Sequence, residues 1–226
     1  MDALLITEEL FLLTHDDETG KADNLVAGAV AFAGALLLDL AEQGLVQADG
    51  KKLVPVGSTA THPLLAEAAA ELAASKKPRD ARHWVDRLPR VLKPFEDKIG
   101  TSLVERGVLR REDGKALGLF KYTKWPERDP EPERRLRAGL ADVLGRGAQP
   151  TPRQELLIPL LATMGYVPKL VAKDERKAAK ARAKEITDAA KDGSLVSSAV
   201  SQSVAATQSA VLAAVMTPMI AASVNN

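Results

Sequence analysis

The chain has 226 residues, of which 46% are hydrophobic and 27% charged, so it encodes a folded protein rather than a disordered one. The formal net charge of +1 provides no global basic field of the kind that non-specific nucleic-acid binding requires. The absence of cysteine excludes disulfides, thiolate metal sites and a cysteine nucleophile.

The first quarter of the chain predicts two helices and a hairpin. Thr7 is expected to cap a short helix over EELFLL, and the polar segment THDDETGK predicts a loop. A long apolar helix follows from about Asn24. Its uncharged run, residues 25–38, is too short for a membrane span, which needs about 20 apolar residues. LVQADGKKLVPV then predicts a hairpin that turns at Asp49-Gly50.

The middle of the chain predicts three further helices and a second hairpin. One helix begins near Pro63, and a short one over KPRDARHWVDRL is expected to end at Pro89. After Pro94, apolar residues recur every four positions, which indicates an amphipathic helix. VLRREDGKALGLFKY predicts a hairpin that turns at Asp113-Gly114.

The two hairpins share one scheme, in which a helix ends at a glycine and is followed by a strand, an Asp-Gly-Lys turn and a second strand. The matching segments are LAEQGLVQADGKKL and LVERGVLRREDGKAL. An old duplication explains this scheme, and so does convergence, because each turn and helix end needs the same residues.

The last part of the chain predicts helices only. They are expected over about 133–144, over about 153–164 with a bend at Pro159, over a basic segment near 173–190, and over an uncharged C-terminal tail. The tail is weakly hydrophobic and contains Ser, Thr, Gln and Pro218, so it is expected to close the core rather than to span a membrane.

Patterns typical of catalysis, metal binding or cofactor binding are missing from the sequence. His15, His62 and His83 have no metal-ligand spacing, and the HDDE run at 15–18 is expected to be a solvated turn. Neither a phosphate-binding glycine loop nor a GxSxG motif is present. We therefore expect a non-enzymatic protein without a metal or cofactor. The acidic start MDALLITEEL argues against a signal peptide and favours a cytoplasmic protein.

Two segments concentrate positive charge. The first is the helix predicted near 173–190, whose Lys and Arg form either a solvated face or a surface for anionic lipid. The second surrounds the hairpin over 106–124. A helix followed by a basic hairpin is also typical of winged-helix DNA-binding proteins, but Glu96, Asp97 and Glu105 on that helix would repel phosphate.

The segment GLFKYTKWPERDPEPERR, residues 118–135, holds three of the few aromatic residues of the chain within six positions. The rings alternate with lysines, and prolines follow them. Aromatic side chains beside Lys and Arg favour a membrane–water interface, and packing of the rings on neighbouring helices is the alternative.

Several segments, taken in order, resemble the Golgi-phosphoprotein family. They are LLITEELFLLTHDDETG, GALLLDLAEQGLVQ, LVERGVLRRE, LGLFKYTKWPERDPEPERRLRAGL and KARAKEI, and the resemblance extends from about residue 4 to 215. The Ala- and Arg-rich text is similar to actinobacterial members. Eukaryotic members bind phosphatidylinositol 4-phosphate and retain glycosyltransferases.

The resemblance implies a mainly α-helical protein that forms one domain over 1–226. Central apolar helices would be ringed by amphipathic ones, with short β-hairpins. It also implies a membrane-inserting hairpin beside a lipid head-group pocket. The inserting residues would be Leu119, Phe120, Tyr122 and Trp125, with Lys121 and Lys124 beside them.

The residues of the family's head-group pocket are largely replaced in this chain. The matched positions are Asn24, Ala33, Lys93, Glu96 and Lys98, of which only the two lysines carry positive charge. Without the aromatic ring and the guanidinium groups, the bidentate phosphate contacts that give selectivity are lost. The sequence therefore predicts association with anionic phospholipid membranes in general. The alternatives are a protein–protein or self-association module that uses the same hairpin, and a winged-helix-like nucleic-acid binder.

Overall fold

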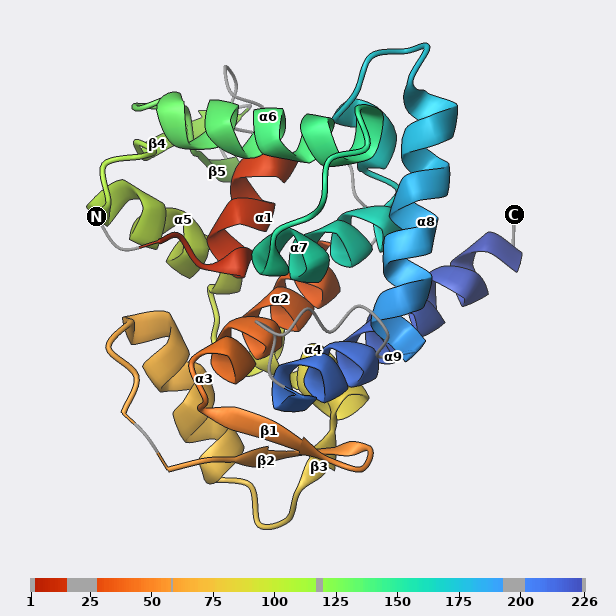
Figure 1. Ribbon diagram of the computed structural model, residues 1–226. Helices are drawn as coiled ribbons and strands as arrows, with labels where there is room; N and C mark the ends of the chain where they lie inside the picture. The colour runs from red at the N-terminus through yellow and green to blue at the C-terminus, as the bar shows by residue number, and fades with distance from the viewer. Residues whose placement is uncertain (1–2, 16–27, 58, 117–119, 193–201, 225–226) are drawn as a thin grey trace.

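The computed structural model describes residues 3–15, 28–57, 59–116, 120–192 and 202–224. Figure 1 shows a mainly helical protein in which α2 runs through the middle and the other helices surround it. The described helices are α1 (Ile6–Thr14), α2 (Gly28–Glu42), α3 (Pro63–Ala73), α4 (Ala81–Val91), α5 (Phe95–Glu105), α6 (Glu131–Gly145), α7 (Pro152–Thr163), α8 (Arg176–Asp192) and α9 (Gln202–Val224), with a 3₁₀ turn η1 (Val167–Lys169). The predicted fold class, mainly α with short hairpins, is confirmed.

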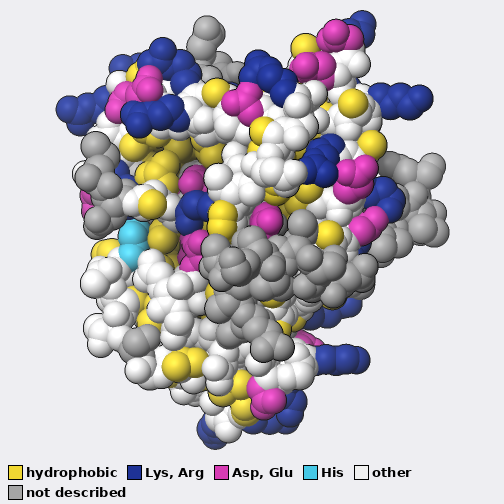
Figure 2. Space-filling view, in the orientation of Figure 1, with side chains coloured by type: hydrophobic (Ala, Val, Ile, Leu, Met, Phe, Trp, Pro, Cys, Tyr) yellow, Lys and Arg dark blue, Asp and Glu magenta, His cyan; other side chains and the backbone are white. Residues whose placement is uncertain are grey.

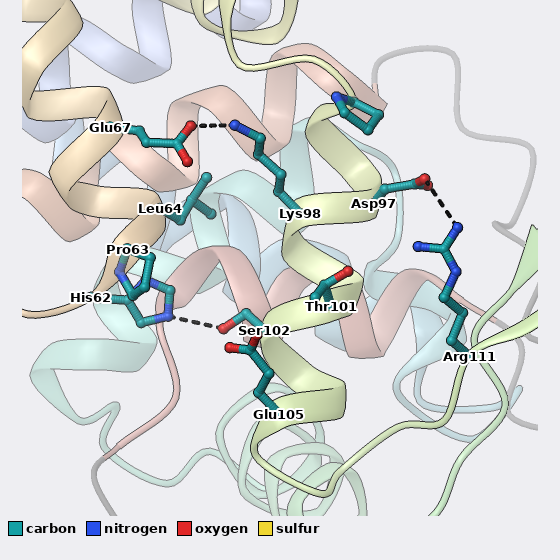
Figure 3. A pocket seen from close by; sticks show the side chains of 11 residues that line it. His62, Pro63, Leu64, Glu67, Asp97, Lys98, Thr101, Ser102, Glu105 and Arg111 are labelled. Carbon is teal, nitrogen blue, oxygen red and sulfur yellow. Dashed lines mark hydrogen bonds and ion pairs between the residues drawn. The ribbon is translucent and has the colours of Figure 1, made fainter.

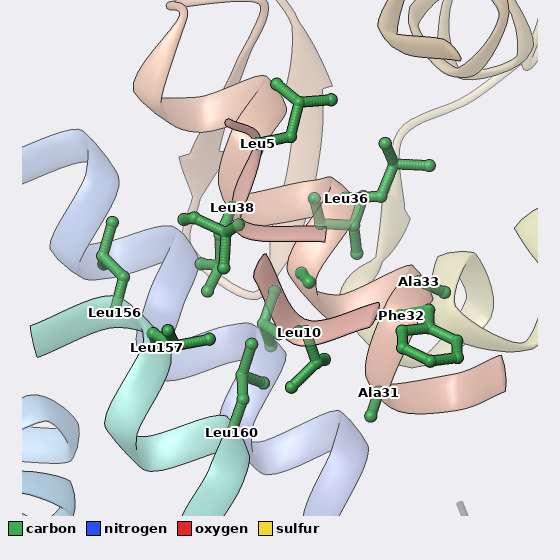
Figure 4. Close-up of a cluster of buried hydrophobic side chains, with 14 of the residues drawn as sticks. Leu5, Leu10, Ala31, Phe32, Ala33, Leu36, Leu38, Leu156, Leu157 and Leu160 are labelled. Atoms are coloured by element: carbon green, nitrogen blue, oxygen red, sulfur yellow. The ribbon is translucent and has the colours of Figure 1, made fainter. Parts of the chain in front are cut away.

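The core forms around α2 because this helix is apolar on nearly every side. Its sequence GAVAFAGALLLDLAE leaves no polar stripe, and residues 31–41 are all buried. The neighbours that pack on it are chiefly α1, α4 and α9. At Gly34 a Cβ atom would lie 2.9 Å from Val215 of α9, so the glycine allows the two helices to approach closely. Figure 4 shows leucines of α1, α2 and α7 meeting at this centre.

A buried carboxylate joins α1 to α2. Asp39 accepts hydrogen bonds from the Ile6 amide (2.6 Å), the Thr7 amide (3.0 Å) and the Thr7 hydroxyl (2.6 Å). Burial raises the pKa of Asp39 to about 7, although these hydrogen bonds oppose the rise. The prediction that Thr7 caps α1 was wrong, since the helix begins at Ile6 and its first amides are satisfied by Asp39 from another helix.

A half-buried arginine extends the same junction to α7. The Arg153 guanidinium donates to Glu9 of α1 and to Glu42 of α2, each at 2.8 Å, and to the carbonyl of Leu4. One residue of α7 therefore fixes both helices around Asp39. The N-terminus of α7 is itself capped by the hydroxyl of Thr151, which accepts from the Gln154 amide.

The first hairpin follows the sequence prediction. Strands β1 (Val46–Asp49) and β2 (Lys52–Pro55) pair antiparallel, and the short β3 (Arg79–Asp80) adds to β2. Gly50 has φ +58°, a left-handed conformation that the Asp-Gly turn requires. The turn at Asp49-Gly50 is confirmed.

The second hairpin turns at a different place from the predicted one. Strands β4 (Glu112–Ala116) and β5 (Phe120–Lys124) pair so that Asp113 faces Thr123 and Gly114 faces Tyr122. Asp113-Gly114 is therefore inside a strand. Gly114 is required there for another reason, because a Cβ at this position would lie 2.5 Å from the Tyr122 ring. The glycine makes room for an aromatic ring across the ladder.

Two of the three prolines expected to shape helices lie where the sequence predicts, and the third does not end its helix. Pro63 begins α3, as predicted, and Pro159 lies inside α7. Pro89, however, does not end α4, which continues to Val91. The break before α5 falls instead at Leu92–Pro94, where the Lys93-Pro94 peptide bond is cis.

Candidate functional site

The edge hairpin β4–β5 carries the aromatic segment that the sequence singled out. Its two strands contact chiefly each other, and Figure 1 places them behind α6 and beside α5. Tyr122 lies over Gly114 and is 41% exposed, which makes it one of only three large hydrophobic side chains exposed in the described part of the chain. The Lys124 ammonium lies 5.5 Å from the centre of the Tyr122 ring. The hairpin therefore presents an aromatic ring and a cation together.

Trp125, the residue after β5, is part of the core and not of the exposed surface. It is 5% exposed, its ring forms a T-shaped pair with Phe11 at a centroid distance of 6.2 Å, and the Arg111 guanidinium lies 5.4 Å from its ring centre. The indole also fills the space left by Gly100 of α5, where a Cβ would lie 2.6 Å from the ring. In this conformation Trp125 anchors the hairpin to α1 and α5, which is the packing role held open as an alternative.

The remaining residues of the expected inserting group divide into two sets. Tyr122 and Lys124 lie on β5, and their side chains are the described part of the group at the surface. Leu119 and the side chains of Phe120 and Lys121 lie outside the described residues. The structure thus brings one exposed ring and one cation of the predicted set together on the hairpin.

Two arginines at the base of the hairpin are paired with carboxylates. Arg110 meets Glu112 at 3.1 Å, and Arg111 meets Asp113 at 3.0 Å and Asp97 at 3.8 Å. A hydrogen bond from Thr123 and the Arg111 guanidinium hold the pKa of Asp113 below its usual range. Figure 2 shows the same mixture of Lys and Arg with Asp and Glu at the upper left, where α6 covers the hairpin in this view.

The positions matched to the family's head-group pocket that the structure describes lie in different environments. Ala33 is fully buried in α2, and Asn24 lies outside the described residues. Lys93 and Glu96 are exposed at the start of α5. Lys98, one turn further on, forms an ion pair with Glu67 of α3.

A cavity of about 260 Å³ lies between the start of α3, one face of α5 and Arg111 (Figure 3). Two ion pairs flank it, Lys98 with Glu67 on one side and Arg111 with Asp97 on the other. Glu105 adds a further carboxylate. Because each of these cations already has a carboxylate partner, the cavity lacks the excess of positive charge that a bound phosphate needs.

A polar relay forms one wall of this cavity. The His62 ring nitrogen Nε2 lies 2.9 Å from the Ser102 hydroxyl, which donates to the fully buried carboxylate of Glu8 at 2.5 Å. Glu8 also accepts from the Leu5 amide at 2.8 Å and lies 3.6 Å from Arg106. Burial raises the pKa of Glu8, but hydrogen bonds from His62, Ser102 and Leu5, together with Arg106, hold it below the ordinary value.

The order of this relay differs from that of a catalytic triad. Since the Ser102 hydroxyl gives its proton to Glu8, its oxygen accepts from His62, which places the imidazole proton on Nε2. A nucleophilic serine would instead give its proton to the histidine. The relay therefore fixes α1, α3 and α5 to one another. Sequence reasoning missed it because Glu8 and Ser102 are 94 positions apart.

Among the described residues, no three His, Asp or Glu side chains gather in a way that would hold a metal ion. None of the helices in the described ranges combines the length and apolar character needed to cross a membrane.

The fold and the site define a class: a mainly helical protein with a central apolar helix and an aromatic, cationic hairpin at one edge. The sequence profile of the Golgi phosphoprotein 3 family, GPP34, matches residues 6–207. The chain belongs to this family. A search of curated proteins found no match.

Proposed function

We propose that this protein is a non-enzymatic, peripheral membrane-binding protein of the cytoplasm that contacts anionic phospholipid through the β4–β5 hairpin. The observation that carries the proposal is the pair formed by Tyr122 and Lys124, in which an exposed ring and an ammonium group share one surface. Tyrosine favours the level of the lipid head groups, since its ring is apolar and its hydroxyl is polar. A neighbouring lysine adds attraction to anionic phosphates.

The anchoring of the hairpin supports a contact that needs no large rearrangement. Trp125 holds the end of β5 against Gly100 and Phe11, so the base of the hairpin is fixed to α5 and α1. Tyr122, three residues earlier, is thereby presented on a supported strand. A preformed contact surface loses less conformational entropy on binding than a disordered one.

The charge pattern favours general anionic-membrane binding over selection of one head group. Ala33 and Glu96 stand at two matched pocket positions, and Lys98 is paired with Glu67. Bidentate arginine contacts of the kind that select a phosphorylated head group therefore have no residues to make them at these positions. We expect affinity to follow the surface charge of the membrane.

Sedimentation with vesicles tests the proposal. Vesicles of neutral phosphatidylcholine are compared with vesicles that contain phosphatidylserine, and with vesicles of equal charge that contain phosphatidylinositol 4-phosphate. We expect binding to both anionic types and little to the neutral one. Binding should weaken as ionic strength rises, because exposed charges are screened over about 10 Å at 0.1 M salt.

Matched variants separate the hairpin from the rest of the surface. Lys124→Glu should weaken binding roughly tenfold or more, because each basic residue near the membrane contributes about 1 kcal/mol and the change reverses a charge. Tyr122→Ser should also weaken it. Lys51→Glu and Val56→Ser, two exposed positions of the β1–β2 hairpin, are the controls and should bind as wild type.

Equal, negligible sedimentation of all variants with every vesicle would refute the proposal. Light scattering across protein concentration then distinguishes a self-association module, which Tyr122→Ser should dissociate. A gel shift with unrelated duplex DNA at low salt detects the nucleic-acid alternative.

A further inference from the structure

A second cleft lies away from the hairpin, between the end of α7, the 3₁₀ turn η1, α8 and α9. Its volume is about 310 Å³, which is at the lower end of the range for small-ligand sites. In Figure 1, α8 runs along the opposite side of the molecule from β4–β5. The cleft is therefore separate from the surface proposed to contact membranes.

The walls of this cleft are mostly apolar. Ala162 comes from α7, Val167 from η1, Ala183 from α8 and Met216 from α9. The hydroxyl of Thr187, which also lines the cleft, donates to the Ala183 carbonyl at 2.7 Å and so leaves no unsatisfied hydroxyl proton facing a ligand. Such walls suit a hydrocarbon chain, because burying apolar surface is favourable in proportion to its area.

The rim of the cleft is cationic. Lys177, Lys180, Lys184 and Lys191 of α8 follow spacings of three, four and seven, which place them along one face of the helix. The last three of these lysines line the cleft. Asp188 is the carboxylate among the lining residues, and it is shared by Lys184 and Lys191. Lys180 has no ion-pair partner among the described residues, so the rim has a surplus of positive charge.

We propose that this cleft binds the anion of a medium-chain fatty acid. The hydrocarbon chain lies on Ala162, Val167, Ala183 and Met216, and the carboxylate meets Lys180 at the rim. Charge complementarity selects this occupant over a neutral amphiphile or a cationic peptide. The volume selects a short chain over the full acyl chains of a membrane lipid. The inference is independent of the membrane-binding function proposed above.

Calorimetric titration of the full chain with decanoate tests the proposal, at concentrations below those at which decanoate forms micelles. We expect saturable binding at one site. Octanoate should bind roughly tenfold more weakly, as the loss of two buried methylene groups predicts. Decanol, which lacks the charge, should bind several-fold more weakly than decanoate. Equal binding of decanol and decanoate would overturn the role of the lysine rim.

Two pairs of variants locate the site. Lys180→Gln should weaken decanoate binding about two- to fivefold, the usual range for an exposed ion pair, whereas Lys177→Gln, on the same face but outside the cleft, should leave it unchanged. Ala162→Phe fills the cleft and should weaken binding at least tenfold. Ala178→Phe, at an exposed position of α8, is its control.

Amide chemical shifts of the wild-type protein provide a readout that does not depend on any variant. Decanoate should shift the amides of Gly165 and Thr187 and leave that of Gly50 unchanged. Shifts scattered over the surface without saturation, or shifts confined to the β4–β5 hairpin, would refute the site. Tyr122→Ser should keep full decanoate binding, because the two surfaces are separate.

Discussion

Gly100→Ala tests the contact that fixes the candidate membrane-binding hairpin to the body of the protein. An alanine Cβ at this position of α5 would lie 2.6 Å from the Trp125 ring. Carbon atoms pack best at about 3.5–4.0 Å, so the ring has to move by about 1 Å. The ring has little room to move, since the Phe11 ring packs against it with centroids 6.2 Å apart and the Arg111 guanidinium lies 5.4 Å from its centre.

The net effect follows from two opposing contributions. Overpacking of a rigid core costs about 1–3 kcal/mol, and the crowding of Trp125 places this site near the upper end. Replacing glycine by alanine inside a helix contributes up to about 1 kcal/mol in the opposite direction. We expect the free energy of unfolding to fall by about 2 kcal/mol, which lowers Tm by roughly 4–8 °C for a chain of this size.

Thermal and urea unfolding measure this change, and Gly139→Ala is the matched control. Gly139 also lies inside a helix, α6, but a Cβ there would lie 3.0 Å from the end of the flexible Gln154 side chain. That variant should be as stable as wild type or up to about 1 kcal/mol more stable. The reasoning is refuted if Gly100→Ala unfolds at or above the wild-type temperature.

Three further predictions concern buried polar groups and the hairpin. The folded-state pKa of Asp39, about 7, is above its unfolded value near 3.8, so the stability linked to Asp39 is fully present below pH 4 and is lost as pH rises through 7. This pH-dependent contribution to stability is of order 4 kcal/mol. The difference in unfolding free energy between wild type and Asp39→Asn should therefore shrink between pH 4 and pH 7. A difference that stays constant with pH would contradict the raised pKa of Asp39. Arg153→Met leaves the Glu9 carboxylate without its arginine partner. The free energy of unfolding, measured in urea, should fall by roughly 2–3 kcal/mol. This loss is smaller than for a fully buried pair because Arg153 is partly exposed. Gly114→Val pushes the Tyr122 ring off the ladder and should weaken vesicle binding without lowering Tm by more than about 2 °C, whereas an equal loss in a Gly57→Val control would point to a general effect.

The relation between sequence and fold is clearest in the two hairpins. Both carry an Asp-Gly pair after a helix that ends at a glycine with positive φ, Gly44 in one case and Gly107 in the other. The pair forms the turn only in the first hairpin. In the second, the pair lies inside β4, where Gly114 leaves room for the ring of Tyr122 across the ladder, so this cross-strand contact favours the observed register.

In the candidate site, too, the sequence predicts one part and the tertiary structure decides another. The sequence was sufficient to place Tyr122 and Lys124 in one group of rings and cations, because these residues lie close together in one strand-like segment. It did not distinguish Tyr122 from Trp125, which are equally aromatic in the sequence. Only the packing of Trp125 against Gly100 and Phe11 separates a buried anchor from an exposed contact.

The sequence by itself determined the helices, the apolar character of α2 and the first turn, because periodicity and backbone preference act over a few residues. The tertiary structure decided the rest. The Asp39 carboxylate that satisfies the start of α1 is 33 positions from Ile6, and the relay from His62 through Ser102 to Glu8 joins three helices. Such contacts form because buried polar groups must find partners wherever the fold places them, and no local pattern specifies which residues those are.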